Sequence, residues 1–486
     1  MEKDKKVKIK KTKKNLTKIK IRKNNLFGKG LRRSNQAIRI FWRKTKLFLN
    51  NKPLLKKTLY TLLLLLIFRI SATITVPGVK SVNRDAFNSA SSFLGLMDLM
   101  GGGAINRFSI VALGISPYIT ASILMTILQS EIFPPLYRLA NSGASGRRKI
   151  NIITRWITLI IGIFQAITIS QSFISNQILT LIPRLREVWF QYIGLPLILL
   201  AGSMFTLFLG ESITKNGIGN GTSLIIFSGV AVALPGKLRA SFNYFIQPGT
   251  SSVFIGAVNF IGYLFLILTL IFLISFIYKS ERHIPLQQTG KGMTNDAKQM
   301  SKLPMKLNTA GVIPIMFSAL VVIIPLQVSQ LLPKWSYERE WILNNLTFTK
   351  PIGLSIYACV TFFFSIIMSL LIFQPAKISE NFFKSGIFIP GIRPGNDTEK
   401  YITRTLLRLS IFSGIYLTLI GTSTYLMQIF IFNSTQQGVQ ATFGGTSMII
   451  LISVAIETWQ QMKTRSNTRK ISKIKTKEQE NGGLLW

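Results

Sequence analysis

Long apolar segments separated by short polar ones dominate the chain from residue 57 onward. A helix needs about 20 apolar residues to cross the roughly 30 Å hydrocarbon layer of a membrane. Ten segments come close to that length, at 57–76, 107–128, 153–172, 188–210, 217–235, 253–278, 308–332, 353–373, 405–432 and 441–462. The pattern therefore predicts an all-α polytopic membrane protein with ten transmembrane helices.

Two of the ten segments make poor membrane spans. The stretch 101–124 opens with three glycines, carries Arg107 and has Pro117 in its middle, and the fifth span is rich in glycine. Irregular backbone at membrane depth is tolerated only where it is buried in protein or lines a cavity. We therefore expect the first of these stretches to line a pore, with Pro117 bending the backbone at the lining.

Basic residues alternate between successive polar segments. The chain has 58 Lys and Arg against 17 Asp and Glu, although 48% of its residues are hydrophobic. If the N-terminus is cytosolic, 46 of the basic residues fall in cytosolic segments, and Arg69 and Arg408 lie within spans. This bias is typical of cytosolic loops, so both termini are predicted to be cytosolic. The long basic N-terminus also argues against a cleavable signal peptide.

Several segments lie outside the predicted spans. Residues 1–56 form a charge run, for which disorder is the default interpretation, and residues 463–486 form a basic cytosolic tail. The N-terminal run has a competing interpretation, binding to anionic lipid or ribosomal RNA. Residues 279–307 and 374–404 are longer than ordinary connections and predict cytosolic docking loops, with plain solvated loops as the alternative. Residues 236–252 are expected to form an external hinge loop.

A weak internal repeat divides the spans into two halves. The second and seventh spans share GISPYI and GVIPIM, and the fifth and tenth share GTSLII and GTSMII. Because each half holds an odd number of spans, the second half is inverted, and a pathway is expected at the interface between them. The halves are predicted at 57–235 and 253–462.

The repeat also marks equivalent positions around the predicted axis. These are Ile119, Ile226, Met316 and Ile450. Ile115 and Thr222 each precede one of them by four residues and so share its helix face. A neutral lining differs from that of ion-selective pores and proton-coupled carriers, which carry fixed charges. The alternative is ordinary packing between helices.

Five stretches together resemble the signature of the SecY family, in the family's order and at its spacing. They are GGGAINRFSIVALGISPYITASIL, GIGNGTSLIIFSG, LPMKLNTAGVIP, SGIFIPGIRPG and FGGTSMII, and the resemblance covers about residues 57–462. It implies two inverted five-helix halves around a central hourglass pore, with a plug and a lateral gate. It also implies a protein-conducting channel that passes unfolded preproteins across the membrane and releases transmembrane segments sideways into lipid.

The resemblance assigns a constriction ring and a plug. The ring is Ile115, Ile119, Thr222, Ile226, Met316 and Ile450. Thr222 departs from the family's usual aliphatic residue, so the ring either seals less tightly or is filled by the flexible Met316. The plug covers 91–103, with Phe93, Leu94, Leu96, Met97, Leu99 and Met100 followed by the hinge glycines Gly101, Gly102 and Gly103. In the alternative interpretation, 91–103 is a re-entrant connector without a gating role.

The resemblance also implies docking residues and partners. Arg393 matches an arginine on which translocation depends in the family, and the other basic candidates are Lys384, Lys400, Arg404, Arg282 and Lys291. The first loop keeps only Lys291 where many relatives have paired arginines, which weakens the expectation of ribosome docking there. The implied partners are the SecA ATPase, the ribosome and its RNA, SecE-like and SecG-like subunits, signal peptides and nascent chains, a YidC-type insertase and anionic lipids.

Other function classes are less consistent with the sequence. One histidine, His283, and one cysteine, Cys359, leave no Cys/His metal cluster, and no cofactor or enzymatic activity is expected. The alternative function is a secondary transporter of small solutes built on inverted repeats, which would need polar coordinating residues at mid-membrane. Richness in Asn, Lys and Ile indicates an AT-rich genome, so the predicted location is a bacterial plasma membrane, with a plastid thylakoid membrane as the alternative.

Overall fold

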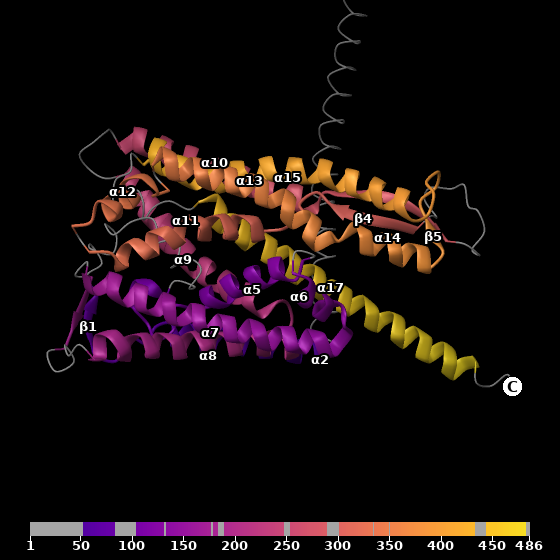
Figure 1. Ribbon diagram of the computed structural model, residues 1–486, viewed down its shortest axis with the longest axis horizontal. Helices are drawn as coiled ribbons and strands as arrows, with labels where there is room; N and C mark the ends of the chain where they lie inside the picture. Colours follow the sequence, from indigo (N-terminus) through magenta and orange to yellow (C-terminus); the bar gives the residue numbers. More distant parts are fainter. Residues whose placement is uncertain are drawn as a thin grey trace, which may run out of the picture. The chain divides into compact units, whose positions relative to one another are not determined.

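The computed structural model describes most of the chain (Figure 1). The described residues are 52–82, 104–130, 133–175, 178–182, 189–246, 253–288, 301–333, 335–348, 350–432 and 444–482. Leu63–Met462 form one compact unit, and Met1–Leu62 with Lys463–Trp486 form another. The predicted plug at 91–103, Lys291 and residues 1–51 of the N-terminal extension lie outside the described residues.

Ten long helices correspond to the ten predicted spans. They are α2 (Lys52–Ser71), α5 (Ser116–Leu128), α7 (Gly143–Ser175), α8 (Leu195–Asn216), α9 (Gly221–Phe245), α10 (Val253–Lys279), α11 (Ile313–Leu331), α13 (Pro351–Phe373), α15 (Asn396–Phe430) and α17 (Gly445–Gly482). Within the described residues, six of them are long and apolar enough to cross a membrane, and α5 and α11 are shorter apolar helices. The ten-helix prediction is confirmed, although α5 and α11 are shorter than expected.

The unit formed by Leu63–Met462 contains two groups of helices, with α11 between them (Figure 1). In the first group α7 packs against both α5 and α8, and α8 packs against α9. In the second group α13 packs along α15. Helix α11 contacts α13 in its own half and both α5 and α7 in the other half. Within the described residues, α11 is thus one place where the two halves meet, and α9 with α10 is another.

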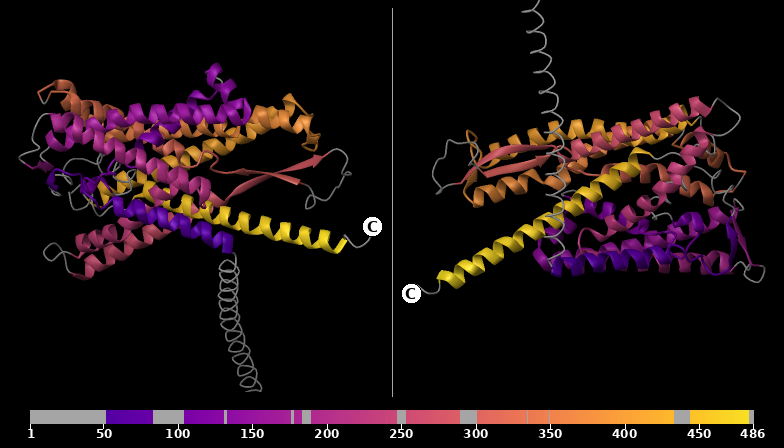
Figure 2. Two further views of the ribbon diagram at one scale, coloured as in Figure 1. Left: turned by 90° about the horizontal axis from the view of Figure 1, so that it is seen from below. Right: turned by 180° about the vertical axis from the view of Figure 1, so that it is seen from behind.

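The described parts of the two predicted docking loops contain regular structure that the sequence prediction did not include. Strands β3 (Glu281–Gln288) and β4 (Ser301–Lys306) form an antiparallel hairpin that extends from the helices in Figure 2. The second segment contains α14 (Pro375–Lys384), the short strand β5 (Ile387–Phe388) and the first turns of α15. Because β5 pairs with the end of β3, both segments belong to one three-stranded sheet.

An apolar cluster explains why these polar-looking segments fold. Its fully buried members are Ile284, Leu286, Met305, Ile389, Ile402 and Leu406, contributed by β3, β4, the residue after β5 and α15. Strand residues alternate between faces, so one apolar residue in two is enough to cover a hydrophobic face. We call β3, β4, α14, β5 and the start of α15 the strand module. The sequence prediction missed the strand module because polar and apolar residues are mixed in each strand.

The predicted hinge loop at 236–252 is also shorter than expected. Helix α9 continues through Pro235 to Phe245, and α10 begins at Val253. Aromatic rings join the two helices near this connection. The ring of Phe245 lies 5.8 Å from that of Tyr263 in α10 and 5.6 Å from that of the buried Phe432.

Smaller elements complete the described structure. A π-helical turn, η3 (Phe190–Gly194), leads into α8, and the short helices α6 (Pro134–Asn141) and α12 (Tyr337–Asn345) connect longer ones. Strands β1 (Val79–Val82) and β2 (Leu179–Leu181) form a second antiparallel sheet. The fold is therefore mostly helical, with two small sheets that the all-α prediction did not include.

Candidate functional site

The second predicted span, 107–128, is α-helical only in its second part. A short 3₁₀ turn, η1 (Ile105–Arg107), is followed by irregular turns, and α5 begins at Ser116. The turns contain two residues with positive φ, Phe108 at 44° and Gly114 at 54°. Pro117 occupies the second position of α5, where its missing N–H leaves no hydrogen bond unmade. The span predicted at 107–128 is therefore helical only from Ser116, and the backbone changes direction in the turns before Pro117.

The irregular turns before α5 are buried against other protein segments. The backbone N–H of Ile110 donates to the carbonyl of Ile74 at 3.0 Å, and that of Val76 donates to the carbonyl of Phe108 at 3.0 Å. Phe108 itself is fully buried, with its ring 4.9 Å from that of Phe173. The polar backbone groups thus find partners inside the protein, which is the condition for irregular backbone at membrane depth.

Helix α8 supports the same turns from the side. The hydroxyl of Thr206 donates to the carbonyl of Gly114 at 2.8 Å. One turn earlier, Gly202 approaches so closely that a Cβ atom at this position would overlap the carbonyl of Ile110. Because Ile115 directly follows these turns, its position depends on how tightly α8 packs here.

The internal repeat corresponds to repeated helix starts. Gly114 and Gly311 both have positive φ, and two residues after each a helix begins with proline at its second position. Helices α9 and α17 both begin at the repeated glycine, Gly221 and Gly445. A Cβ atom on either glycine would overlap a backbone carbonyl of another helix, that of Gly210 or Ile420. The short sequence matches therefore encode matched local structures in the two halves.

The six predicted ring residues lie at or near these helix starts. Ile119 and Met316 are the fourth residues of α5 and α11, and Ile226 and Ile450 are the sixth residues of α9 and α17. Ile115, Ile119 and Ile226 are buried, and the other three, Thr222, Met316 and Ile450, are partly exposed. Contact between α5 and α11 brings two of the four helices together. The arrangement of all six side chains around one axis stays a prediction.

Thr222 is part of the cap of α9. Its hydroxyl donates to the Oδ1 atom of Asn220 at 2.7 Å, and its backbone N–H donates to the same oxygen at 3.2 Å. An asparagine that accepts from the first turn is a favourable N-cap. The polar atom of Thr222 is thus already paired, and the side chain otherwise presents a methyl group.

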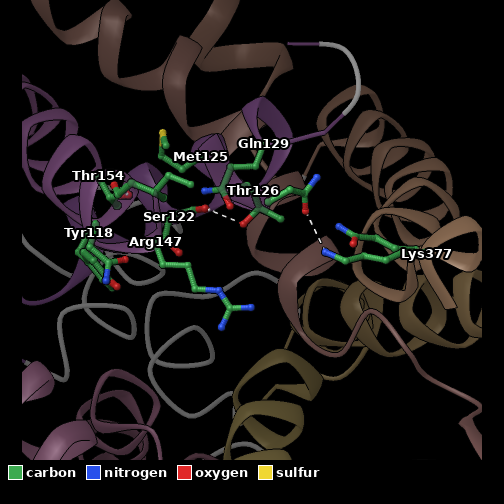
Figure 3. A pocket seen from close by; sticks show the side chains of 13 residues that line it. Tyr118, Ser122, Met125, Thr126, Gln129, Arg147, Thr154 and Lys377 are labelled. Atoms are coloured by element: carbon green, nitrogen blue, oxygen red, sulfur yellow. Dashed lines mark hydrogen bonds between the residues drawn. The ribbon is translucent and has the colours of Figure 1, made fainter. Parts of the chain in front are cut away.

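A polar cavity of about 420 Å³ lies where α5, α6 and α7 meet the junction of α13 and α14 (Figure 3). Its lining includes Tyr118, Thr126, Gln129 and the two cations Arg147 and Lys377, but no Asp or Glu. Nζ of Lys377 donates to Oδ1 of Asn141 at 2.9 Å, so one hydrogen bond crosses between the two halves at the cavity rim. The cavity is therefore lined by residues of both halves.

Arg393 stands on a fixed loop at the tip of the strand module. The flanking Gly391 and Gly395 have φ of 81° and 103°, values that favour glycine. The buried Thr398 donates its hydroxyl to the carbonyl of Arg393 at 2.9 Å, and the buried Ser379 donates to that of Gly395 at 2.8 Å. The Arg393 side chain itself is exposed. The loop thus presents a guanidinium from a backbone held on both sides.

The other predicted docking residues lie in different local settings. Lys384 donates to Glu380 one turn earlier in α14 at 2.6 Å, and this ammonium lowers the pKa of the Glu380 carboxyl. Lys400 and Arg404 are exposed and four residues apart, so they share one face of α15. Arg282 is exposed on β3. The sheet places Arg282 and Arg393 in one module, whereas Lys384 is partly neutralised by its neighbour.

Several positioning residues were not found from the sequence. Gly202, Thr206 and Thr398 carry no signal in a single sequence, because their roles depend on contacts across the fold. Two asparagines do have a signal in the sequence. Asn220 directly precedes Gly221 and Asn308 lies three residues before Gly311, and asparagine close to glycine is typical of turns and caps.

Comparisons of the sequence with known proteins give a consistent result. A family model described as SecY matches residues 109–459. The protein translocase subunit SecY of Mycoplasma capricolum is 38% identical over 435 residues, which cover 87% of this chain and 89% of that one. The same subunit of Halalkalibacterium halodurans is 36% identical over 414 residues, covering 84% and 94%.

Solved structures show the same fold at much lower identity. A structure described as that of a protein conducting channel is 17% identical, with a TM-score of 0.59, and the match covers 85% of this chain and 92% of that chain. Sec61 in a canine ribosome-channel complex is 16% identical, with a TM-score of 0.53 and the same coverage.

Proposed function

The chain belongs to the SecY family and is the protein-conducting channel subunit of a Sec translocon in a bacterial plasma membrane, and we propose that its constriction is formed at the paired helix starts. The ring would consist of Ile115, Ile119, Thr222, Ile226, Met316 and Ile450. One observation carries this proposal. Equivalent ring residues lie the same number of residues from the start of their helices, four for Ile119 and Met316 and six for Ile226 and Ile450. Inverted halves place equivalent residues about a common axis, where they can meet.

Crosslinking to a translocating chain tests the ring. We expect cysteines introduced as Ile119→Cys and Ile226→Cys to form adducts with a stalled secretory chain that carries one cysteine. The native Cys359 is exposed and should first be replaced by serine. The measurement is the yield of adducts after brief oxidation.

A matched position in α10 controls for nonspecific reaction. The side chain of Phe265 is 72% exposed on that helix, so Phe265→Cys reports reaction outside the pore. Adduct yields at 119 and 226 no higher than at 265 would contradict a central pore lined by these residues.

The departure of Thr222 from an aliphatic residue leads to a second expectation. Thr222→Ile adds apolar bulk to the ring and is expected to lower resting ion leak roughly fourfold, the effect of about one buried methylene. Thr222→Val, which removes the hydroxyl without lengthening the side chain, should leave the leak near the original level. Single-channel recording in planar bilayers measures both. An unchanged leak in the isoleucine variant would show that the ring is already sealed.

Topology and gating follow from the same proposal. In this proposal both termini are cytosolic, the strand module is cytosolic, and the plug is assigned to 91–103, which lie outside the described residues. A signal peptide enters between α5 and α7 of one half and α11 and α13 of the other. The polar cavity beside these helices provides room at the cytosolic end of this gate. Breaking the hydrogen bond from Lys377 to Asn141 would accompany its opening.

Partners would dock on the strand module. The channel is passive, and SecA or a translating ribosome supplies the driving force. Either partner would contact Arg393, and the neighbouring cations Lys400, Arg404 and Arg282 would add to the binding. A planar guanidinium suits both the carboxylates of a protein and the phosphates of RNA. The Sec61 complex named above includes a ribosome, which supports the second possibility. SecE-like and SecG-like subunits, a YidC-type insertase and anionic lipids would meet the exposed apolar helices within the membrane.

A further inference from the structure

Asn308 lies in the connection between the strand module and α11. Its side chain is buried, with 6% exposure, and makes three hydrogen bonds. Oδ1 accepts from the backbone N–H of Gly311 at 2.9 Å, and Nδ2 donates to the carbonyl of the same residue at 3.1 Å. These two bonds close the turn that precedes α11.

The third hydrogen bond ties this turn to another helix. The hydroxyl of Ser413 in α15 donates to Oδ1 of Asn308 at 3.2 Å. Ser413 is fully buried, and α15 packs along α13 and into the apolar cluster of the strand module. The start of α11 is therefore hydrogen-bonded to a buried position of α15.

One other side-chain hydrogen bond lies in the connection before α11, from the hydroxyl of Thr309 to the carbonyl of Lys306 at 2.9 Å, and it stays within that connection. The N-cap residue of α11, Val312, provides no side-chain hydrogen bond, and Gly311 needs glycine only for its φ of 66°, since a Cβ there would contact nothing within 4 Å. Helix α11 also packs on α13, and Asn308 adds the side-chain hydrogen bonds that join the turn before α11 to α15. Met316 follows one turn later in α11, and this helix contacts α5 and α7 across the gate.

Given the proposed channel function, we propose that Asn308 is a positioning residue for gating, which fixes the end of α11 nearest the strand module and sets where Met316 sits in the closed ring. When the gate opens, α11 swings from α5 and α7 about the turn at Asn308 and Gly311. The hydrogen bonds of Asn308 hold the closed position, so their loss shifts the channel toward open states.

Three substitutions test this role. Asn308→Ala removes all three hydrogen bonds and is expected to raise resting ion leak about tenfold or more, and to admit preproteins with defective signal sequences. Ser413→Ala removes only the bond to α15 and should raise the leak roughly fivefold, the effect of one buried hydrogen bond on the gate equilibrium. Asn308→Asp keeps the acceptor oxygen, so its resting ion leak should be closer to that of the original protein than the leak of Asn308→Ala.

A neighbouring serine provides the matched control. Ser410 is equally buried on α15, but its hydroxyl donates to the carbonyl of Leu406 within the same helix. Ser410→Ala should therefore leave the leak unchanged while costing similar thermal stability. The double variant Asn308→Ala/Ser413→Ala should leak no more than Asn308→Ala alone, because both remove the same bond.

The outcomes separate this inference from the channel function itself. If the original protein does not translocate a preprotein with an intact signal sequence, the proposed function fails. If it does, and Ser413→Ala leaks no more than Ser410→Ala while Asn308→Ala only lowers the melting temperature, then Asn308 is merely structural and the inference is overturned.

Discussion

Replacing Gly202 by alanine is expected to lower the free energy of unfolding by about 3 kcal/mol or more, because the new methyl group has no space in a well-packed interior. A Cβ at this position would overlap the carbonyl of Ile110, and a backbone atom cannot move aside as a side-chain end can. Helix α8 must separate from the turns before α5, which also weakens the bond from Thr206 to Gly114. Thermal unfolding in detergent measures the loss, and resting ion leak should rise with it.

Gly262 in α10 is the matched control. It is also a glycine within a membrane helix, but a Cβ there would contact nothing within 4 Å. Gly262→Ala should leave stability unchanged or raise it by less than about 1 kcal/mol. Equal melting temperatures for the two variants would mean that α8 does not approach the turns as closely as described.

Reversing the charge of Arg393 is expected to reduce translocation by more than about a hundredfold, the effect of placing a repulsive charge where an ion pair forms at an interface. The side chain is exposed, so Arg393→Glu should change the melting temperature little. The cause would be loss of docking, since the loop is fixed by Thr398 and Ser379 whatever side chain it carries. SecA-driven uptake of a preprotein into proteoliposomes is the measurement.

Two further variants make this test specific. Arg138→Glu reverses an exposed arginine on α6, outside the strand module, and should leave uptake near the original level. Thr398→Val keeps Arg393 but frees its carbonyl, which should reduce uptake roughly fivefold through a looser loop. Similar uptake by Arg393→Glu and Arg138→Glu would show that general surface charge, rather than Arg393, matters.

The sequence predicted the helices better than their ends. Hydrophobic length is a property of one segment, so all ten spans were located, and the repeat pointed to the paired helix starts. The start of α5 was misplaced because it depends on the positive φ of Gly114 and on contacts with α8. Pro117 is the residue that indicates this start, because proline is favoured in the first turn of a helix.

The strand module was missed for a related reason. Strand β3 is stabilised by β4 in the same hairpin and by β5 from a distant part of the chain, so no single segment shows enough apolar periodicity. The docking residues could still be predicted from the family resemblance. Arg393 belongs to a short sequence motif, and such a motif can be matched without knowing the fold around it. The pairing of Lys384 with Glu380 was visible as an i, i+4 spacing in the sequence.

Four helices, α5, α9, α11 and α17, begin within six residues of a predicted ring position. Each helix N-terminus carries a partial positive charge of about half a proton from its unpaired N–H groups. Around the proposed ring, these four ends would create a positive electrostatic potential, although every ring side chain is neutral. A closed channel of this design would oppose the passage of cations, protons included, by electrostatics as well as by its apolar surface.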